Sequence, residues 1–216
     1  MQELEVANKE CLNLLLVGAH SDDIEIGCGG TLLSLLASRP VAVHWVVLSA
    51  EGEREVEARR SAAAFLGAAA EQDVRIGRFR DGFFPFDGAA IKEYFEDLKA
   101  NVSPDLVFAH RLDDRHQDHR LLAELTWNTF RNHTILEYEV PKYEGDLGQP
   151  NLFVPLEPQV ARRKVDLLMT LFGSQRSKRW FTEDVFTGLM RLRGMEAGLA
   201  GGDAEAFYAR KLLVRV

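Results

Sequence analysis

The sequence has few of the features that mark secreted, membrane or nucleic-acid-binding chains. Only two of its 216 residues are cysteines, Cys11 and Cys28, so no disulfide scaffold is possible and a reducing, cytoplasmic setting is expected. No apolar run approaches the roughly 20 residues of a membrane span, and the polar first ten residues do not resemble a signal peptide. Lys and Arg number 26 against 33 Asp and Glu. The resulting net charge of −7 argues against nucleic acid or an anionic membrane surface as the main partner.

The remaining composition, 46% hydrophobic and 27% charged, is that of an ordinary globular chain. Short apolar runs predict buried strands, and intervening segments show helical periodicity. The expected strands are 13–18, 41–49, 73–79, 105–109, 135–140 and a short one at 151–154. The expected helices are 29–38, 54–70, 89–102, 117–131, 158–171 and 182–194. The closing segment, 203–216, carries no assignment.

Strand and helix alternate four times in the first half of the chain. This alternation is typical of an α/β fold with a Rossmann-like, wound, mostly parallel sheet that is flanked by helices. The sequence contains no internal repeat, low-complexity tract or clear boundary, so residues 1–216 are expected to form a single domain.

Ligand-type side chains follow two strands that this fold places side by side. In the strand order 3-2-1-4, the first strand lies next to the fourth, and ligands bind beyond the carboxyl ends of the strands. The segment after 13–18 contains His20, Ser21, Asp22 and Asp23. The segment after 105–109 contains His110, Asp113, Asp114, His116, Asp118 and His119. The topology therefore predicts one shared crevice.

These residue types suit a catalytic metal site. His20 and Asp23, with a histidine from 116–119, would supply two imidazoles and one carboxylate and leave positions open for water or substrate. A bound metal lowers the pKa of water towards neutrality, and Asp22 is the candidate base that takes its proton. Alone, His20 and Asp23 could equally form a helix-capping turn. Their joint placement with the second segment favours the metal site.

The stretches "AHSDDIEIGCGG" and "DRHQDH" together resemble the PIG-L/LmbE family of zinc-dependent de-N-acetylases. That family's motifs are Ala-His-Pro-Asp-Asp and His-x-Asp-His. Softer landmarks at 49–53, 57–67 and 193–212 extend the resemblance over most of the chain. Ser21 stands where proline is usual, and Ile24 stands where glutamate is frequent. Neither departure removes a ligand.

The resemblance implies a role for each matching residue. His20, Asp23 and His119 would bind Zn²⁺, with Fe²⁺ or Co²⁺ as possible substitutes, and Asp22 would be the general base. His116 would stabilise the oxyanion and could protonate the leaving amine, and Asp118 would orient His116. The reaction implied is removal of an acyl group, most simply acetyl, from an amino sugar or similar small glycoconjugate. The family also implies a homo-oligomer.

Several residues keep two interpretations at this stage. Arg54 and His110 lie beyond or at the ends of expected strands at the same sheet edge, so both are candidate substrate contacts. Arg54 could instead lie in a solvated helix start, and His110 ends its strand and could line the pocket. The glycines of 27–30 resemble a phosphate loop but lack its GxGxxG spacing, so a tight turn into a helix is favoured. The basic run 175–180 could bind a phosphate or carboxylate, or could be a solvated face or subunit contact.

Three other functions remain open from the sequence. The enzyme could hydrolyse another small amide. Two histidines and one carboxylate also describe a non-haem iron oxygenase, although such sites usually lie on all-β folds. The third possibility is a binding module that holds a metal ion without catalysing a reaction. The presence of Asp22 and His116 argues against it, because metal binding alone would not require them.

Overall fold

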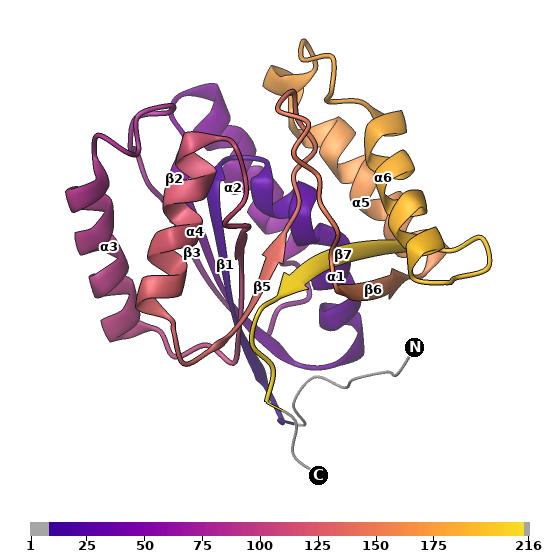
Figure 1. The fold of residues 1–216 in the computed structure, drawn as a ribbon, viewed down its shortest axis with the longest axis horizontal. Coiled ribbons are helices and arrows are strands. Elements are labelled where there is room, and N and C mark those ends of the chain that lie inside the picture. Colours follow the sequence, from indigo (N-terminus) through magenta and orange to yellow (C-terminus); the bar gives the residue numbers. More distant parts are fainter. Residues whose placement is uncertain (1–8, 214–216) are drawn as a thin grey trace.

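The computed structural model describes residues 9–213. Within them, a seven-stranded sheet of order β3-β2-β1-β4-β5-β7-β6 lies between layers of helices (Figure 1). Strands β1 to β5 are parallel, and β7 runs antiparallel to both of its neighbours, β5 and β6. The predicted wound, mostly parallel α/β fold and the order 3-2-1-4 are confirmed.

The elements follow the expected order, with one strand added near the end. The strands are β1 (Leu12–His20), β2 (Val41–Ser49), β3 (Glu71–Ile76), β4 (Leu106–His110), β5 (Thr134–Tyr138), β6 (Leu152–Leu156) and β7 (Asp203–Ala209). The helices are α1 (Asp23–Ser38), α2 (Glu53–Phe65), α3 (Gly88–Asn101), α4 (Gln117–Thr129), α5 (Pro158–Leu171) and α6 (Glu183–Glu196), with a short 3₁₀ turn, η1 (Gly173–Gln175). None of the helices in the described part is long and apolar enough to cross a membrane.

The central strand β1 is apolar on both faces because helices cover both. Its side chains alternate, with Leu14 and Leu16 in one hydrophobic cluster and Leu15 and Val17 in the other. Residues of α1, α2, α5 and α6 complete the first cluster, and residues of α3 and α4 complete the second. Figure 1 shows α3 and α4 together on one side of the sheet. This arrangement explains the continuous apolar runs that predicted the parallel strands.

Helix α1 begins at Asp23, six residues before the predicted start of 29–38. Glycines 27, 29 and 30 therefore lie inside the helix, and the interpretation that they form a sharp turn is wrong. A Cβ atom on Gly27 would lie 2.1 Å from the ring of Tyr138. Close packing against neighbouring side chains thus outweighs the low helix propensity of glycine. The acidic first turn also suits a helix N-terminus.

A buried ion pair contacts the backbone of α1 at these glycines. Lys164 of α5 and Glu205 of β7 lie 2.6 Å apart, with side chains only 4% and 3% exposed. The lysine donates to the carbonyl oxygen of Ile26 at 2.6 Å. The carboxylate accepts from the backbone N–H groups of Gly30 and Thr31, at 2.7 and 2.6 Å. Ile26 and Gly30 would pair with each other in a regular helix, so side chains of α5 and β7 support α1 where its glycines lie.

The second predicted helix is shorter than expected. It ends at Phe65 instead of residue 70, because the chain turns through residues 66–70 to enter β3 at Glu71. The alanine-rich composition of 54–70 suggested a longer helix, but the length of this connection is set by the position of the next strand.

Candidate metal centre and catalytic site

The two ligand-bearing segments meet at the carboxyl edge of the sheet. β1 ends at His20 and β4 ends at His110, and the strands are hydrogen-bonded neighbours in parallel register. Helix α1 begins at Asp23, and α4 begins just after His116, so its first turn carries His119. Each predicted ligand therefore lies on a strand end or a helix start, which are rigid positions.

Two imidazole nitrogens and both carboxylate oxygens of the predicted ligands face one another. His20 Nδ1 lies 3.2 Å from His119 Nε2. The Asp23 carboxylate lies 3.4 Å from His20 Nδ1 through Oδ2 and 3.5 Å from His119 Nε2 through Oδ1. Bonds of about 2.0–2.2 Å in a tetrahedral site place ligand atoms roughly 3.3–3.6 Å apart. The spacing therefore fits a four-coordinate metal ion with one position open.

Other groupings of donor atoms overlap this one. The sets His20, His116, His119; Asp23, His110, His119; and His20, Asp81, Asp118 each place their ligand atoms within 4.8 Å of one another. Hydrogen bonds account for the last two: His110 Nε2 accepts the N–H of Ala19 at 3.1 Å, and Asp118 accepts two backbone N–H groups. The first set shows that His116 borders the same space as the ligands.

In each of the two predicted histidine ligands, the ring nitrogen that does not face the metal position contacts a carboxylate. His119 Nδ1 lies 3.0 Å from Oδ2 of Asp114, and His20 Nε2 lies 3.2 Å from Oδ2 of Asp118 and 3.0 Å from Oδ1 of Asp81. Metal-binding histidines usually donate their second ring N–H to such a carboxylate, which fixes the tautomer and the ring orientation. This feature makes the site suitable for a metal ion.

The pKa shifts of His119 and His20 also favour a bound metal ion. Burial, together with the charge of His110, lowers the pKa of His119 to about 3, so this ring is the neutral imidazole that a metal requires. Burial lowers the pKa of His20, but Asp118, Asp23 and Asp81 outweigh it and raise the pKa well above the ordinary value. Carboxylates here thus stabilise a positive charge, which is what a divalent ion supplies.

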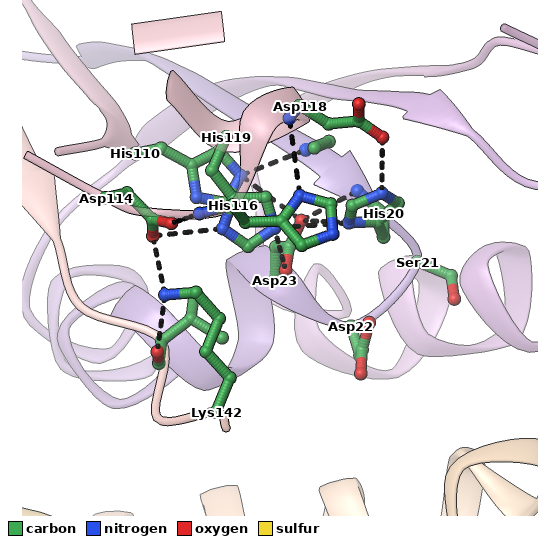
Figure 2. A network of polar contacts seen from close by, with 12 residues as sticks. His20, Ser21, Asp22, Asp23, His110, Asp114, His116, Asp118, His119 and Lys142 are labelled. Carbon is green, nitrogen blue, oxygen red and sulfur yellow. Dashed lines mark hydrogen bonds and ion pairs between the residues drawn. The ribbon is translucent and has the colours of Figure 1, made fainter. Parts of the chain in front are cut away.

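Asp22 lies beside the ligands but outside their hydrogen-bond network (Figure 2). Burial and the adjacent charge of Asp23 raise the pKa of its carboxyl group. The nearest cation, Arg54, lies 3.9 Å away and lowers this pKa only in part. Within residues 9–213 this carboxylate has no hydrogen-bond partner, and its raised pKa suits it to accept a proton from a bound molecule.

His116 is held in one orientation by the helix that it caps. Its Nδ1 accepts the backbone N–H of Asp118 at 3.3 Å. Burial and the positive charge of His20 lower the pKa of His116, so the neutral ring carries its proton on Nε2. This N–H can donate to an oxygen in the adjacent space.

The structure corrects the expected partner of Asp118. Its carboxylate contacts His20 and the backbone N–H groups of Gly82 and Phe84, at 2.6 and 3.1 Å. Only the backbone N–H of Asp118 contacts His116. The expectation that Asp118 orients His116 is therefore wrong for the side chain, because the first turn of α4 directs that carboxylate towards β1.

His110 and Arg54, the two candidate substrate contacts, have different environments. The side chain of His110 is fully buried and stacks on His119, with ring centroids 3.8 Å apart. It lies behind the ligands, so a direct substrate contact is not possible in this conformation. Arg54 faces the cavity and bonds Asp81 at 2.7 Å and the hydroxyl of Ser21 at 3.3 Å. The serine that departs from the family motif thus holds this arginine.

A cavity of about 260 Å³ opens beside these residues. One wall consists of the predicted ligands and their neighbours: His20, Asp22, Asp23, Arg54, His116 and His119. The remaining lining residues are Asp81, which contacts His20 and Arg54, and Val140, Lys142, Tyr143, Glu144, Lys178 and Trp180. The Tyr143 hydroxyl accepts the backbone N–H of Arg179 at 3.2 Å, which joins the β5–β6 loop to the segment between α5 and α6.

The sequence did not predict most of the remaining lining residues of the cavity. Asp81 follows β3 at the same sheet edge, so its position could have been inferred from the topology. Lys142 and Tyr143 lie in a long proline-containing loop whose path has no sequence signature. Asp114 contacts Nδ1 of His119 at 3.0 Å and accepts the backbone N–H of His116 at 2.8 Å, whereas the N-cap of α4 is His116 itself.

Fold and site together define an α/β protein with a buried His/Asp group that can hold a metal ion at the carboxyl edge of its sheet. Residues 15–130 match the PIG-L family, described as GlcNAc-PI de-N-acetylase. This match covers more than half of the chain, and the chain belongs to the PIG-L family.

Similar proteins agree with this assignment. An uncharacterized deacetylase, YaiS, of Escherichia coli (strain K12) is 31% identical over 151 residues, which cover 64% of this chain and 78% of YaiS. The structure of GalB, the 4-carboxy-2-hydroxymuconate hydratase of Pseudomonas putida KT2440, matches with a TM-score of 0.72 at 19% identity, covering 95% of this chain and 98% of GalB. The N,N'-diacetylchitobiose deacetylase of Pyrococcus horikoshii matches with a TM-score of 0.67 at 20% identity, covering 91% and 83% of the two chains. At these identities the two structures show a shared fold.

Proposed function

We propose that this protein is a zinc-dependent hydrolase that removes an N-acetyl group from a small amino sugar. The observation that carries the proposal is the cluster of donor atoms from His20, Asp23 and His119, with separations of 3.2–3.5 Å, beside the Asp22 carboxylate, whose Oδ1 lies 3.9 Å from Arg54. Family membership supports the reaction class. Fe²⁺ or Co²⁺ could replace zinc, since the same ligand types bind both.

The metal ion, when bound, supplies a Lewis acid that activates water and polarises an amide carbonyl. Asp22 takes one proton from the water as its oxygen bonds to the carbonyl carbon. The C–N bond then breaks, and the nitrogen leaves with the proton that Asp22 returns. One amide and one water thus give one carboxylate and one amine. The raised pKa of Asp22 suits a group that first accepts and then donates.

His116 stabilises the oxygen that becomes negative during attack. Its Nδ1 is occupied by the backbone N–H of Asp118, so Nε2–H is the donor available to that oxygen. The lowered pKa of the ring favours this hydrogen-bonding role over protonation of the amine. The second possibility left open by the sequence, proton delivery to the leaving amine, is assigned to Asp22 instead.

The cavity favours a small sugar as the substrate. Its volume of about 260 Å³ lies just below the usual range for ligand pockets, which is roughly 300–1,000 Å³. Tyr143 and Trp180 present aromatic surfaces in its wall, against which the apolar face of a sugar ring can pack. Arg54 is placed to bind a sugar hydroxyl or an anionic substituent. We further propose one domain over residues 1–216, a homo-oligomer and a cytoplasmic location.

The test is acetate release by the zinc-loaded protein from N-acetylglucosamine and its simple glycosides, followed by mass spectrometry. Asp22→Asn is expected to lower turnover about 10²- to 10⁴-fold while the protein retains its metal. Asp113→Asn is the matched control, because that side chain is 75% exposed, and it should keep the wild-type rate. A wild-type rate in Asp22→Asn would refute the base assignment.

Other outcomes would identify another function. If no N-acyl compound loses its acyl group while zinc is bound, the deacetylase proposal fails and a binding module is favoured. Turnover that requires oxygen and 2-oxoglutarate would indicate an oxygenase. Hydration of an unsaturated tricarboxylic acid would indicate an activity like that of GalB, which shares the fold.

A further inference from the structure

Lys142 is a buried ammonium group that the proposed reaction does not use. It lies in the loop between β5 and β6, and its side chain is only 7% exposed. Its Nζ donates to Oδ2 of Asp114 at 2.9 Å, to both carboxylate oxygens of Asp146 at 3.0 and 2.9 Å, and to the carbonyl of Val140 at 3.4 Å. The carboxylates are 2% and 5% exposed, so the three charges are removed from water together.

The first of these carboxylates also supports a predicted metal ligand. Oδ2 of Asp114 is shared between Lys142 Nζ and His119 Nδ1, which lies 3.0 Å away. The contact directs His119 Nε2 towards His20 and Asp23. Figure 2 shows Lys142, Asp114 and His119 as successive members of one chain of contacts. Lys142 is thus two hydrogen bonds away from the metal position.

A buried carboxylate needs such a cation. The other partners of Asp114 are an imidazole N–H and the backbone N–H of His116. Neither carries a full charge when His119 is the neutral ligand. Removing one partner of a buried ion pair leaves a charge without compensation, which destabilises the arrangement around it. The expected response is a shift or rotation of the Asp114 side chain, with loss of its hold on His119.

The second carboxylate fixes the loop that carries Lys142. Oδ2 of Asp146 accepts the backbone N–H of Arg115 at 2.7 Å, and the backbone carbonyl of Asp146 accepts from Arg111. Both arginines belong to the segment between β4 and α4. The neighbours of Lys142 in sequence, Tyr143 and Glu144, form part of the cavity wall. The same ammonium therefore joins the metal ligand to the wall that contacts the substrate.

We propose that Lys142 is a positioning residue that holds His119 towards the metal through Asp114 and fixes the cavity wall through Asp146. The expected effect on KM rests on the proposed function, but the first measurement, zinc affinity, needs no substrate. Asp146 offers a way to separate the two effects, because it contacts Lys142 and not His119.

The experiment measures zinc affinity by chelator competition for Lys142→Met, Lys142→Arg and Asp146→Asn. Lys142→Met is expected to weaken zinc binding about 10-fold, the lower end of the roughly 10- to 100-fold loss that follows removal of a group hydrogen-bonded directly to a metal ligand. Lys142→Arg should restore most of the affinity, because it keeps the charge. Asp146→Asn should leave zinc affinity within about threefold of the wild type and raise KM, because the Asp114 contact remains.

If Lys142 only stabilised the fold, its variants would change thermal stability and leave zinc affinity unchanged. If Lys142→Met lowered the melting temperature but bound zinc with wild-type affinity, the inference would be overturned. Should that variant not fold, Lys142→Gln is measured in its place, with the same expected weakening, and the absorbance of bound Co²⁺ reports the ligand geometry. These binding readouts stand whether or not the protein deacetylates sugars, whereas the Asp22→Asn test concerns turnover. The two failures are therefore distinguishable.

Discussion

The carboxylate of Asp118 lies 3.2 Å from Nε2 of His20, across the gap between the first turn of α4 and the end of β1. The contact places Asp118 beside the ring nitrogen of a proposed metal ligand, on the side away from Asp23 and His119. Asp118→Asn is therefore expected to weaken zinc binding about 10- to 100-fold. Chelator competition measures this directly. If zinc affinity stayed at the wild-type value and only turnover fell, Asp118 would act on the reaction and not on the metal.

His116 has two roles that a single pair of variants can separate. Its ring caps α4 through Nδ1 and is proposed to donate Nε2–H to the reacting oxygen. Loss of such a donor lowers kcat about 10²- to 10³-fold, and loss of an N-cap costs about 1 kcal/mol. His116→Ser keeps a capping hydroxyl but is too short to reach the substrate, whereas His116→Ala loses both functions.

Both His116 variants are expected to lose kcat to a similar extent, and only the alanine variant should show the lower melting temperature. Steady-state kinetics and thermal unfolding are the two measurements. A serine variant with wild-type kcat would contradict the proposed hydrogen bond to the oxygen.

Lys178 offers a test of the basic run 175–180. It is exposed, lines the cavity and, among residues 9–213, forms no ion pair. Lys178→Gln is expected to lower kcat/KM for N-acetylglucosamine 6-phosphate about two- to fivefold, since an exposed ion pair contributes roughly 0.2–1 kcal/mol. The value for unmodified N-acetylglucosamine should change less, through the charge of Lys178 near Asp22 alone. Equal effects on both sugars would favour a general effect on the cavity wall.

The pair Lys164 and Glu205 predicts strongly non-additive stability effects. Lys164→Met or Glu205→Gln alone should lower the free energy of unfolding by about 3–5 kcal/mol, because each leaves a buried charge without its partner. The double variant should lose less than the sum of the two. Urea unfolding of the four proteins measures the coupling. Additive losses would show that the pair acts through separate contacts.

The sheet could be predicted from the sequence because its strands are buried on both faces. The run Val41–Ser49 was predicted with its observed bounds, since β-branched residues dominate it. The positions of His20 and His119 followed from the rule that parallel strands bring their carboxyl ends to one edge. The start of α1 could not be predicted, because the glycines of 27–30 fit the space beside Tyr138 and that space is created by a strand about a hundred residues later.

Contacts between side chains that are distant in the sequence could not be predicted either. The partner of Asp118 depends on which way the first turn of α4 faces, and the family resemblance implied His116. The burial of His110 depends on its stacking against His119. Lys142 reaches Asp114 only because its loop crosses back over the sheet edge. These relationships follow from tertiary packing and have no local pattern.

The support of α1 by Glu205 has a consequence for the order in which the chain can mature during synthesis. The helix that carries Asp23 emerges early from the ribosome, whereas the carboxylate that binds its Gly30 and Thr31 N–H groups is translated about 175 residues later. Until β7 joins the sheet, these two amides and Lys164 lack their partner. The N-terminal half of α1, which carries the proposed metal ligand Asp23, therefore gains these contacts only when β7 has been made.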